Sequence, residues 1–484
     1  MPRTALPPLL LPALGRDGAE PLQRQLYLAL RAVILQGRLA VGGRLPSSRA
    51  LAAQLGISRN TVLAAYGQLQ AEGYVDSRPA SGLTVAALDT GPARTDPIPA
   101  LCGERRISRR AAVLGAGMGG DTADALPLSP RGSDAALFPA REWSRLLARR
   151  WRRPGAALLA GGDAAGYLPL RQAIAEHLGR SRGVRCVAGQ VVVVSGSQQA
   201  LDLAARLLLD PGEGAWIEEP GYTGLKAALR AAGAVPMPVP VDGLGFDPRA
   251  AERQGGGARA AFITPSHQFP TGATMPVERR LALIDWAAHS GGWIVEDDYD
   301  SDFRYGGPPL AALQGLDPGQ RTLYCGTFSK SMFPGLRLGW LVVPPDLVAP
   351  LLALRAAADG APPLLGQAAM ADFMAEGLFQ AHLRRLRAAY GERRAAVLAA
   401  ARTHLGGLAD ISAGEAGTHI LAWLPEGADD QAVAKAARAQ GVGPAPLGRY
   451  RLLPGRPGLI LGYAAWTPAG LEAAVVVLAR ILRS

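Results

Sequence analysis

Lys330 is the residue whose type and surroundings point most directly to covalent chemistry. The chain has three lysines, Lys226, Lys330 and Lys435, and Lys330 lies in the apolar, glycine-rich stretch 326–340. A primary amine in such a setting can be held neutral and nucleophilic, so it can condense with a carbonyl group to form a Schiff base. A solvated surface lysine, the usual fate of this residue type, fits the setting less well. We therefore expect Lys330 to be the catalytic residue of a ligand-binding site.

Groups that commonly bind phosphate occur near this lysine and at a second place in the chain. Ser329 and Arg337 supply a hydroxyl and a guanidinium. The turn 195–200 follows a run of four valines and opens a helical pattern, and backbone N–H groups at a helix start form an anion site. Ser197 and Gln198 can add side-chain donors there. Taken alone, such a turn is more often only a connection.

A third cluster is acidic. The apolar run 293–296 ends in Glu296 and is followed by Asp297 and Tyr299. Carboxylates at the carboxyl end of a buried strand lie where ligands bind in open α/β sheets. One carboxylate there could keep the ring nitrogen of an organic cofactor protonated, and Tyr299 could bond a ring oxygen. The alternative is a solvated acidic loop.

The elements that must position these residues alternate between strand and helix. Short runs that are apolar on both faces predict buried strands at 191–195, 215–218, 261–264, 293–296, 322–326 and 338–343. Helical patterns such as 198–209 and 277–289 separate them, which predicts a mostly parallel α/β sheet. After about residue 345 the pattern is helix-rich, with a late strand at 459–463 and a final helix at 468–482. This indicates a smaller C-terminal α/β subdomain.

The N-terminal part has a different pattern. Helices are predicted at about 21–36, 47–56 and 58–73, with Ser47 or Ser48 and then Ser58 at the caps, followed by a hairpin over 74–85. The tight turn between the second and third helices is typical of a helix-turn-helix, and the hairpin would be its wing. The alternative is a three-helix bundle with no role in DNA binding.

Composition supports this multidomain organisation. The 484 residues divide into an arm (1–20), a winged helix (21–86), a proline- and glycine-rich linker (87–125) and a large domain (126–484), with the small subdomain at about 345–484. The net charge of +11 fits a polyanionic partner or an arginine-rich composition bias. The cysteines, Cys102, Cys186 and Cys325, form neither a disulfide framework nor a metal site, and no apolar run is long enough to span a membrane. A cytoplasmic protein without a membrane partner is expected.

The motifs 44–52 (Arg-Leu-Pro-Ser-Ser-Arg-Ala-Leu-Ala) and 58–62 (Ser-Arg-Asn-Thr-Val), together with the wing, resemble the GntR family of winged-helix repressors. This resemblance implies double-stranded DNA as a partner. The start of the third helix carries residue types that reach base edges and phosphates in the major groove. The predicted DNA-binding residues are Arg44, Ser48, Arg49, Arg59, Asn60, Thr61 and Arg78.

Residues 126–484 resemble the pyridoxal 5′-phosphate (PLP) dependent aminotransferases of fold type I. The likeness rests on the motif 329–340 and on the order of the phosphate turn, 219–222, 265–272, the acidic strand and the lysine. It implies that Lys330 forms a Schiff base with PLP, that Asp297 pairs with the pyridinium and that Tyr299 contacts the phenolic oxygen. It also implies a homodimer, a ring-stacking role for Tyr222, and phosphate binding by Ser197, Gln198, Ser329 and Arg337.

The fusion of these two parts resembles the MocR family of regulators. Three departures from aminotransferases favour regulation over turnover. No asparagine precedes Pro270, so Gln268 or His267 could substitute for it or Tyr299 could act alone. Ile460 stands near the place where many aminotransferases have a carboxylate-binding arginine, and Gly161 stands where many have a tyrosine. The resemblance implies a PLP-dependent transcription regulator that senses PLP or an amine or amino acid through Lys330. The alternatives are an active aminotransferase with a vestigial DNA-binding module and a plain DNA binder with an unliganded large domain.

Overall fold

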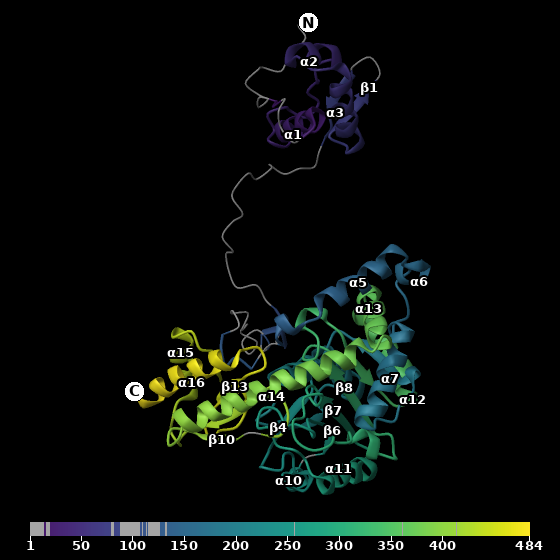
Figure 1. The fold of residues 1–484 in the computed structure, drawn as a ribbon. Helices are drawn as coiled ribbons and strands as arrows, with labels where there is room; N and C mark the ends of the chain where they lie inside the picture. Colours follow the sequence, from purple (N-terminus) through teal and green to yellow (C-terminus); the bar gives the residue numbers. More distant parts are fainter. Residues whose placement is uncertain are drawn as a thin grey trace. The chain divides into compact units, whose positions relative to one another are not determined.

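The computed structural model describes residues 14–15, 20–78, 82–87, 107–108, 110–112, 114, 126–130, 133–255, 257–360, 362–412 and 414–484. Most of the predicted arm and linker, including Cys102, lies outside these residues. The chain divides into two compact units, Met1–Arg106 and Ile107–Ser484, and each is described by itself (Figure 1). Within the described residues, no helix combines the length and the apolar character that crossing a bilayer requires.

The first unit consists of three helices and a two-stranded antiparallel hairpin. Its elements are α1 (Leu22–Leu35), α2 (Ser48–Leu55), α3 (Arg59–Ala71), β1 (Val75–Arg78) and β2 (Gly82–Val85). The cap residues follow the prediction: Oγ of Ser47 accepts the Ala50 N–H at 3.2 Å, and Gly56 ends α2 in the left-handed conformation. The order of helix, turn, helix and hairpin is that of a winged helix-turn-helix.

One apolar core holds this unit together. Leu26 and Leu30 of α1 and Val62 and Leu69 of α3 have no exposed surface. The Tyr66 hydroxyl donates to the Pro46 carbonyl at 2.9 Å and so fixes the segment before α2 against α3. The angle between these two helices is therefore set by packing as well as by the turn.

The second unit is built on a seven-stranded sheet of order β3-β9-β8-β7-β6-β4-β5. The neighbours pair in parallel except at β9, which runs against both β3 and β8. The strands are β3 (Val191–Val194), β4 (Gly214–Glu219), β5 (Val235–Pro240), β6 (Ala258–Ile263), β7 (Trp293–Asp298), β8 (Thr322–Thr327) and β9 (Gly339–Val342). Six of them match the predicted runs to within three residues at each end.

Strand β5 has no counterpart among those predicted runs. Its sequence, Val-Pro-Met-Pro-Val-Pro, contains a proline at every second residue, a composition that argues against an interior strand. β5 lies at the edge of the sheet, where the alternation turns all the missing N–H groups away from β4. The three prolines therefore cost no ladder hydrogen bond and protect the open edge.

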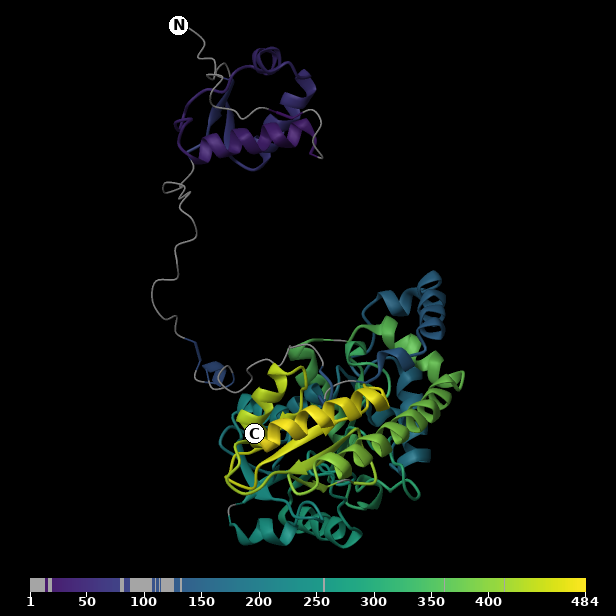
Figure 2. The ribbon, with the colours of Figure 1, turned by 60° about the vertical axis from the view of Figure 1, so that its left-hand side comes forward.

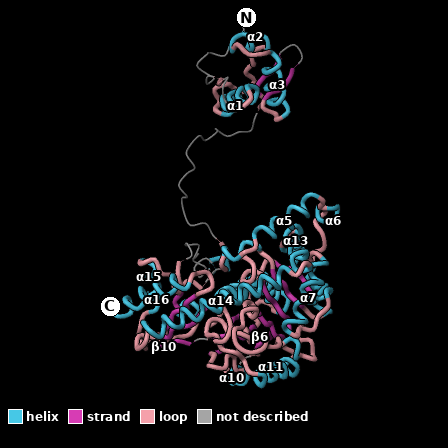
Figure 3. The backbone as a smooth tube through the Cα atoms, viewed as in Figure 1, coloured by secondary structure: helices cyan, strands magenta, loops and turns pink. Residues whose placement is uncertain are grey.

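Helices cover both faces of this sheet, so the strands lie inside the unit (Figure 3). One face packs against α8 and α12, and the other faces helices in two further apolar clusters, one of which includes α5, α7 and α13. The helices of this part are α5 (Ala140–Arg152), α6 (Gly155–Leu159), α7 (Leu168–Arg182), α8 (Ser197–Leu208), α9 (Thr223–Ala232), α10 (Pro248–Arg253), α11 (Val277–Ser290), α12 (Pro345–Ala358) and α13 (Leu364–Ala375).

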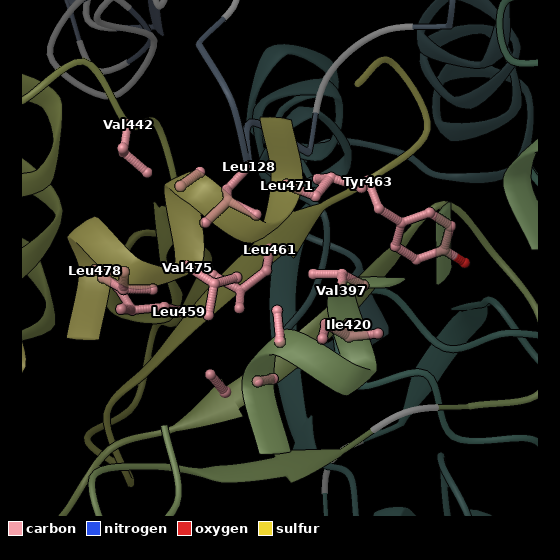
Figure 4. Close-up of a cluster of buried hydrophobic side chains, with 14 of the residues drawn as sticks. Leu128, Val397, Ile420, Val442, Leu459, Leu461, Tyr463, Leu471, Val475 and Leu478 are labelled. Atoms are coloured by element: carbon pink, nitrogen blue, oxygen red, sulfur yellow. The ribbon is translucent and has the colours of Figure 1, made fainter. Parts of the chain in front are cut away.

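A smaller α/β layer completes the unit. Its antiparallel sheet has the order β10-β11-β13-β12, and α14 and α16 run side by side (Figure 2). Leu461 of β13 and Val475 and Leu478 of α16 lie in its core with Leu128, from the start of the unit (Figure 4). The elements are α14 (Leu378–His404), β10 (Asp410–Ser412), β11 (His419–Trp423), α15 (Asp430–Ala439), β12 (Ala445–Pro446), η6 (Leu447–Tyr450), β13 (Gly458–Gly462) and α16 (Pro468–Arg483).

Candidate cofactor site and nucleic-acid interface

The turn between β3 and α8 brings together most of the predicted phosphate ligands. Gly196 has φ 111° and ψ 177°, a conformation that is essentially restricted to glycine. A β-carbon placed on Gly196 would lie 3.6 Å from Oγ1 of Thr327, 3.8 Å from Nη1 of Arg337 and 3.9 Å from Oγ of Ser329. Two hydroxyls and a guanidinium thus converge on the N-terminus of α8, where backbone N–H groups already favour an anion.

Ser197, the first residue of α8, fits the same role. Its Oγ is buried and has no hydrogen-bond partner within the described part of the chain. Buried hydroxyls are nearly always bonded, so this atom marks a place where a ligand atom belongs. Thr327 was not among the predicted ligands, because a threonine ending a buried strand reads as part of the core. Its Oγ1 donates to Oγ of Ser329 at 2.9 Å and accepts the Ser329 N–H at 3.0 Å.

Gln198 and Tyr222 are neighbours at the start of α9. The Gln198 side chain donates to the Gly224 carbonyl at 2.9 Å. A β-carbon on Gly224 would lie 2.1 Å from Oε1 of Gln198 and 2.4 Å from the Tyr222 ring, so a larger residue there would displace both side chains. Tyr222 is 38% exposed, which leaves surface on which a planar ligand ring could stack.

Asp297 stands near the end of β7 beside Cys325 of β8. Its Oδ1 is buried and has no hydrogen-bond partner among the described residues. Burial, reinforced by the nearby charge of Asp298, raises the pKa of Asp297 to about 7, although the Cys325 thiol opposes the shift. A protonated ring nitrogen placed against Oδ1 would satisfy this carboxylate and restore its ionised form.

Glu218, at the end of β4, is an acidic residue of the site that the sequence did not indicate. It lines a small cavity together with Asp297 and Tyr222, and burial raises its pKa to about 7. The Thr264 hydroxyl donates to it at 2.5 Å and the Gln268 side chain at 3.2 Å. The Gln268 side-chain amide also donates to the carbonyls of Pro220 and Phe269, so it is engaged by protein groups and not directed at a ligand. The suggested substitution of Gln268 for the absent asparagine is therefore not supported.

Tyr299 belongs to a buried polar network. Nδ1 of His267 lies 2.9 Å from the Tyr299 hydroxyl and 3.1 Å from both carboxylate oxygens of Asp300. Nε2 of His267 is buried without a hydrogen-bond partner in the described structure. Burial raises the pKa of Tyr299 well above 10, so its hydroxyl stays protonated and can donate to a ligand oxygen.

Lys330 follows β8 by three residues and is half-buried. His419, from β11 of the smaller layer, lies within electrostatic reach of it. Burial lowers the pKa of His419 to about 3, and the charges of His267 and Lys330 contribute to the shift. A neutral imidazole therefore lies near the amine. His419 gave no signal in the sequence because it comes from a segment 89 residues further along the chain.

The residues present fit PLP. Two of the buried atoms that have no partner among the described residues, Ser197 Oγ and Asp297 Oδ1, belong to residues predicted to contact opposite ends of that molecule, the phosphate and the pyridine nitrogen. Tyr222 is partly exposed. Lys330 follows β8, which pairs with β7, the strand that carries Asp297.

The predicted DNA-binding residues lie on α2, α3 and the hairpin, except for Arg44, which precedes α2. Arg49, Arg59 and Asn60 are exposed, and Nε of Arg59 donates to Oγ of Ser48 at 3.3 Å across the turn. Thr61 is tied to the cap by its N–H bond to Oγ of Ser58 at 3.1 Å. Arg44 is exposed and forms a backbone bridge with Thr84 of the wing. Arg78 ends β1, and its side chain lies outside the described structure.

Comparison with known proteins agrees with both parts. Residues 22–85 match "Bacterial regulatory proteins, gntR family", and residues 156–475 match "Aminotransferase class I and II". The probable rhizopine catabolism regulatory protein MocR of Rhizobium meliloti is 41% identical, with 94% of this chain and 92% of that protein aligned. The pyridoxine biosynthesis regulator PdxR of Corynebacterium glutamicum is 34% identical over 77% of each chain.

Among solved structures, the α-aminoadipate aminotransferase LysN of Thermus thermophilus, complexed with N-(5′-phosphopyridoxyl)-L-leucine, superposes with a TM-score of 0.70. The identity is 29%, and the superposition covers 77% of this chain and 98% of that one. The gntR domain, the aminotransferase domain and the likeness to MocR over nearly the whole chain lead to one assignment. The chain belongs to the MocR-type helix-turn-helix transcriptional regulators, whose aminotransferase-like domain is a PLP domain.

Proposed function

We propose that this regulator binds DNA through α2, α3 and the hairpin, and that its large domain controls this binding according to whether PLP, or an amine that reacts with it, occupies the Lys330 site. The observation that carries the proposal is that two buried atoms, Ser197 Oγ and Asp297 Oδ1, find no partner in the described part of the chain, in a site that also contains Lys330. A vestigial cofactor site would be expected to have filled or lost such atoms, because unsatisfied buried polar groups are costly.

Each residue has a role set by its position. Ser197, Ser329 and Arg337 bind the phosphate at the start of α8, where Thr327 orients Ser329, and Gln198 links α8 to the start of α9 through the Gly224 carbonyl. Asp297 accepts the proton-bearing ring nitrogen, the Tyr299 hydroxyl donates to the ring oxygen and Tyr222 covers a ring face. When bound, PLP supplies an aldehyde carbon that exchanges between primary amines. Lys330 provides the resident amine, with which an effector amine competes.

The surroundings of the site favour effector amines that lack a carboxylate. Ile460 is fully buried in an apolar cluster with Leu421, Leu447 and Tyr450, and Phe269 packs against it. The buried imidazole of His419 is neutral at physiological pH and packs on the same Phe269 ring, with centroids 5.4 Å apart. A carboxylate placed against this wall would lose its hydration without gaining a cationic partner. PLP itself is the second candidate effector, in keeping with the name of the PdxR relative.

The remaining features of the proposal concern assembly and location. A homodimer would present two winged helices to two operator half-sites, and the half-site spacing would then follow from the geometry of the dimer. The cytoplasm is the compartment in which DNA, PLP and a reduced Cys325 are found together.

The proposal is tested by measuring the affinity of the full chain for duplexes that it selects from a random pool. The apo protein, the PLP-saturated protein and the Lys330→Ala variant are compared at a fixed salt concentration. A change in affinity on PLP addition that is absent in Lys330→Ala supports control through this site. Equal affinities in all three would leave a DNA binder without this input. Rapid amino transfer to 2-oxoglutarate would indicate an enzyme instead.

A further inference from the structure

A histidine–aspartate pair lies directly beside Tyr299 in the interior of the large unit. Nδ1 of His267 is 3.1 Å from both carboxylate oxygens of Asp300, and the two side chains are only 2% and 1% exposed. The Tyr299 hydroxyl is 2.9 Å from the same nitrogen. A carboxylate that orients an imidazole, which in turn contacts a hydroxyl, is an arrangement that controls where a proton is held.

The surroundings of the His267 ring indicate which of its nitrogens carries a proton. A lone pair on Nδ1 would face the two oxygens of Asp300 with no hydrogen between them, whereas an N–H group at that position is bonded. Nε2 is buried and finds no acceptor among the described residues. A buried N–H group without an acceptor is costly. Both observations assign a proton to Nδ1.

The imidazole is held in this orientation by the groups around it. Gly417 has φ 91°, and a β-carbon on Gly417 would lie 2.1 Å from Cε1 of His267. A β-carbon on Gly272 would lie 3.4 Å from Nε2. The His419 ring packs against the same imidazole, with centroids 5.3 Å apart. These contacts leave the ring little freedom to turn away from Tyr299.

The charges around the pair keep the Tyr299 hydroxyl protonated. Burial raises the pKa of Tyr299 well above 10. Three nearby carboxylates act in the same direction: Asp300, Asp297 and Glu218. On the other side of His267, burial lowers the pKa of His419 to about 3, and the charges of His267 and Lys330 contribute to that shift. His419 therefore brings no charge to the pair at physiological pH, and Tyr299 keeps a proton that it can donate.

We propose that His267 is a positioning residue that acts through Tyr299, and that Asp300 sets the tautomer of His267. Because Nδ1 is a donor, the Tyr299 hydroxyl cannot donate to it, and the hydroxyl proton stays available to the phenolic oxygen of PLP. This inference rests on the proposed function, in which Tyr299 donates to that oxygen. It gives His267 a role other than direct substitution for the asparagine that aminotransferases have before Pro270, since the imidazole supports Tyr299 and does not itself contact the ring oxygen.

The tautomer is tested in the apo protein, where PLP plays no part. Nitrogen NMR spectra of histidine-labelled protein distinguish protonated from unprotonated ring nitrogens, and the signals lost in His267→Leu identify His267. We expect a protonated Nδ1 in wild type and a proton on Nε2 in Asp300→Asn, because an asparagine amide can donate to Nδ1 and invert the tautomer. A wild-type His267 with its proton on Nε2 alone, or an unchanged tautomer in Asp300→Asn, would overturn the inference.

The effect on the site is measured on PLP-loaded full chain, as the pH midpoint at which the visible band changes wavelength. A hydrogen bond to the phenolic oxygen stabilises its anion, so loss of that bond raises the midpoint. Tyr299→Phe, His267→Leu and Asp300→Asn should each raise it by about one pH unit. His177→Asn is the matched control, because His177 is also buried and lies 3.7 Å from an aspartate, Asp302, and it should leave the midpoint unchanged.

The double variant His267→Leu/Tyr299→Phe separates a positioning role from a merely structural one. If His267 acts through Tyr299, the double variant has the same midpoint as Tyr299→Phe alone. A further rise in the double variant, or wild-type midpoints in both PLP-loaded His267→Leu and Asp300→Asn, would overturn the inference and leave the proposed function intact. Absence of a visible band in wild type would contradict the proposed function, and the spectra of the apo protein would still show separately whether Asp300 holds the proton on Nδ1.

Discussion

Nη1 of Arg337 lies 3.8 Å from the point that a β-carbon on Gly196 would occupy. Two segments 141 residues apart in the chain therefore meet at the start of α8. The Gly196 backbone and the Arg337 side chain together border the proposed phosphate site. A methyl group on Gly196 would make ordinary contacts with the surrounding side chains, and it would occupy space that the phosphate is proposed to use.

Gly196→Ala is expected to weaken PLP binding strongly. The φ of 111° is unfavourable for alanine by about 1–3 kcal/mol, and the added methyl group enters the space between Ser329 and Arg337. The dissociation constant of PLP, measured by absorbance, should rise by about tenfold or more. Gly189→Ala is the matched control, because no atom lies within 4 Å of the added carbon and its backbone is not left-handed. Equal affinities of the two variants would argue against a phosphate at Gly196.

Asp297→Asn should change how the stability of the apo protein depends on pH. The pKa of Asp297 is about 7 in the folded chain and near 4 in the unfolded chain, so the folded state binds more protons between these values. The contribution of Asp297 to stability is therefore fully present below pH 4 and is lost as the pH rises toward 7, by up to about 4 kcal/mol. Glu218, with a raised pKa of about 7, adds to the same trend.

Chemical denaturation of apo wild type and apo Asp297→Asn between pH 5 and pH 8 measures this effect. The wild type should lose more stability over the range than the variant, and saturating PLP should reduce the difference because the ring nitrogen stabilises the ionised carboxylate. Identical pH profiles of the two apo proteins would contradict the burial of an unpaired Asp297 carboxyl.

Substitutions on the winged helix should separate affinity from sequence choice. Arg49→Ala removes one candidate phosphate contact, so it should weaken binding to all duplexes alike and reduce the salt slope of log K by about one. Arg59→Ala, at the start of α3, should instead reduce the preference for the selected duplex over a random one. Arg24→Ala on α1, where Arg24 pairs with Glu20 at 3.0 Å, is the control and should leave both quantities unchanged. Uniform behaviour of the three variants would refute this assignment of the surface.

Effector amines without a carboxylate should act at lower concentrations than amino acids of similar size. The reason is the apolar wall around Ile460 and the neutral His419, which offer a carboxylate no ionic partner. Cyclohexylamine and norleucine can be compared by the concentration at which each changes the absorption spectrum of the PLP-loaded protein. A lower effective concentration for norleucine would show that a carboxylate-binding group has been overlooked.

Patterns within the chain predicted the buried strands, the helix caps and the hairpin. Runs such as Val191–Val194 are apolar on both faces, and Ser47 and Gly56 carry their cap signals locally. Strand β5 was missed because its prolines mask an edge strand, and β10 and β12, with three and two residues, are too short to stand out from their surroundings. Strand β11 was missed although it is as long as β13, which the sequence did predict. The sequence therefore predicts a strand or a cap well when neighbouring residues alone determine it.

The same distinction applies to the site. Lys330 and Asp297 were predicted because each stands in a distinctive local setting. Glu218, Thr327 and His419 were not, because their importance arises from segments that meet only in the folded chain. The elevated pKa of Glu218 and the depressed pKa of His419 follow from burial by distant residues, which no local window of the sequence contains.

The most direct test of the central claim is an absorbance titration of the purified full chain with PLP, carried out in parallel on Lys330→Ala and on the conservative variant Lys330→Arg. Wild type should develop a visible band that saturates at one equivalent per chain and disappears on borohydride reduction, while neither variant forms it. A wild-type protein without such a band, or a Lys330→Ala protein with the same band at the same PLP concentration, would contradict the assignment of Lys330 as the residue that holds PLP.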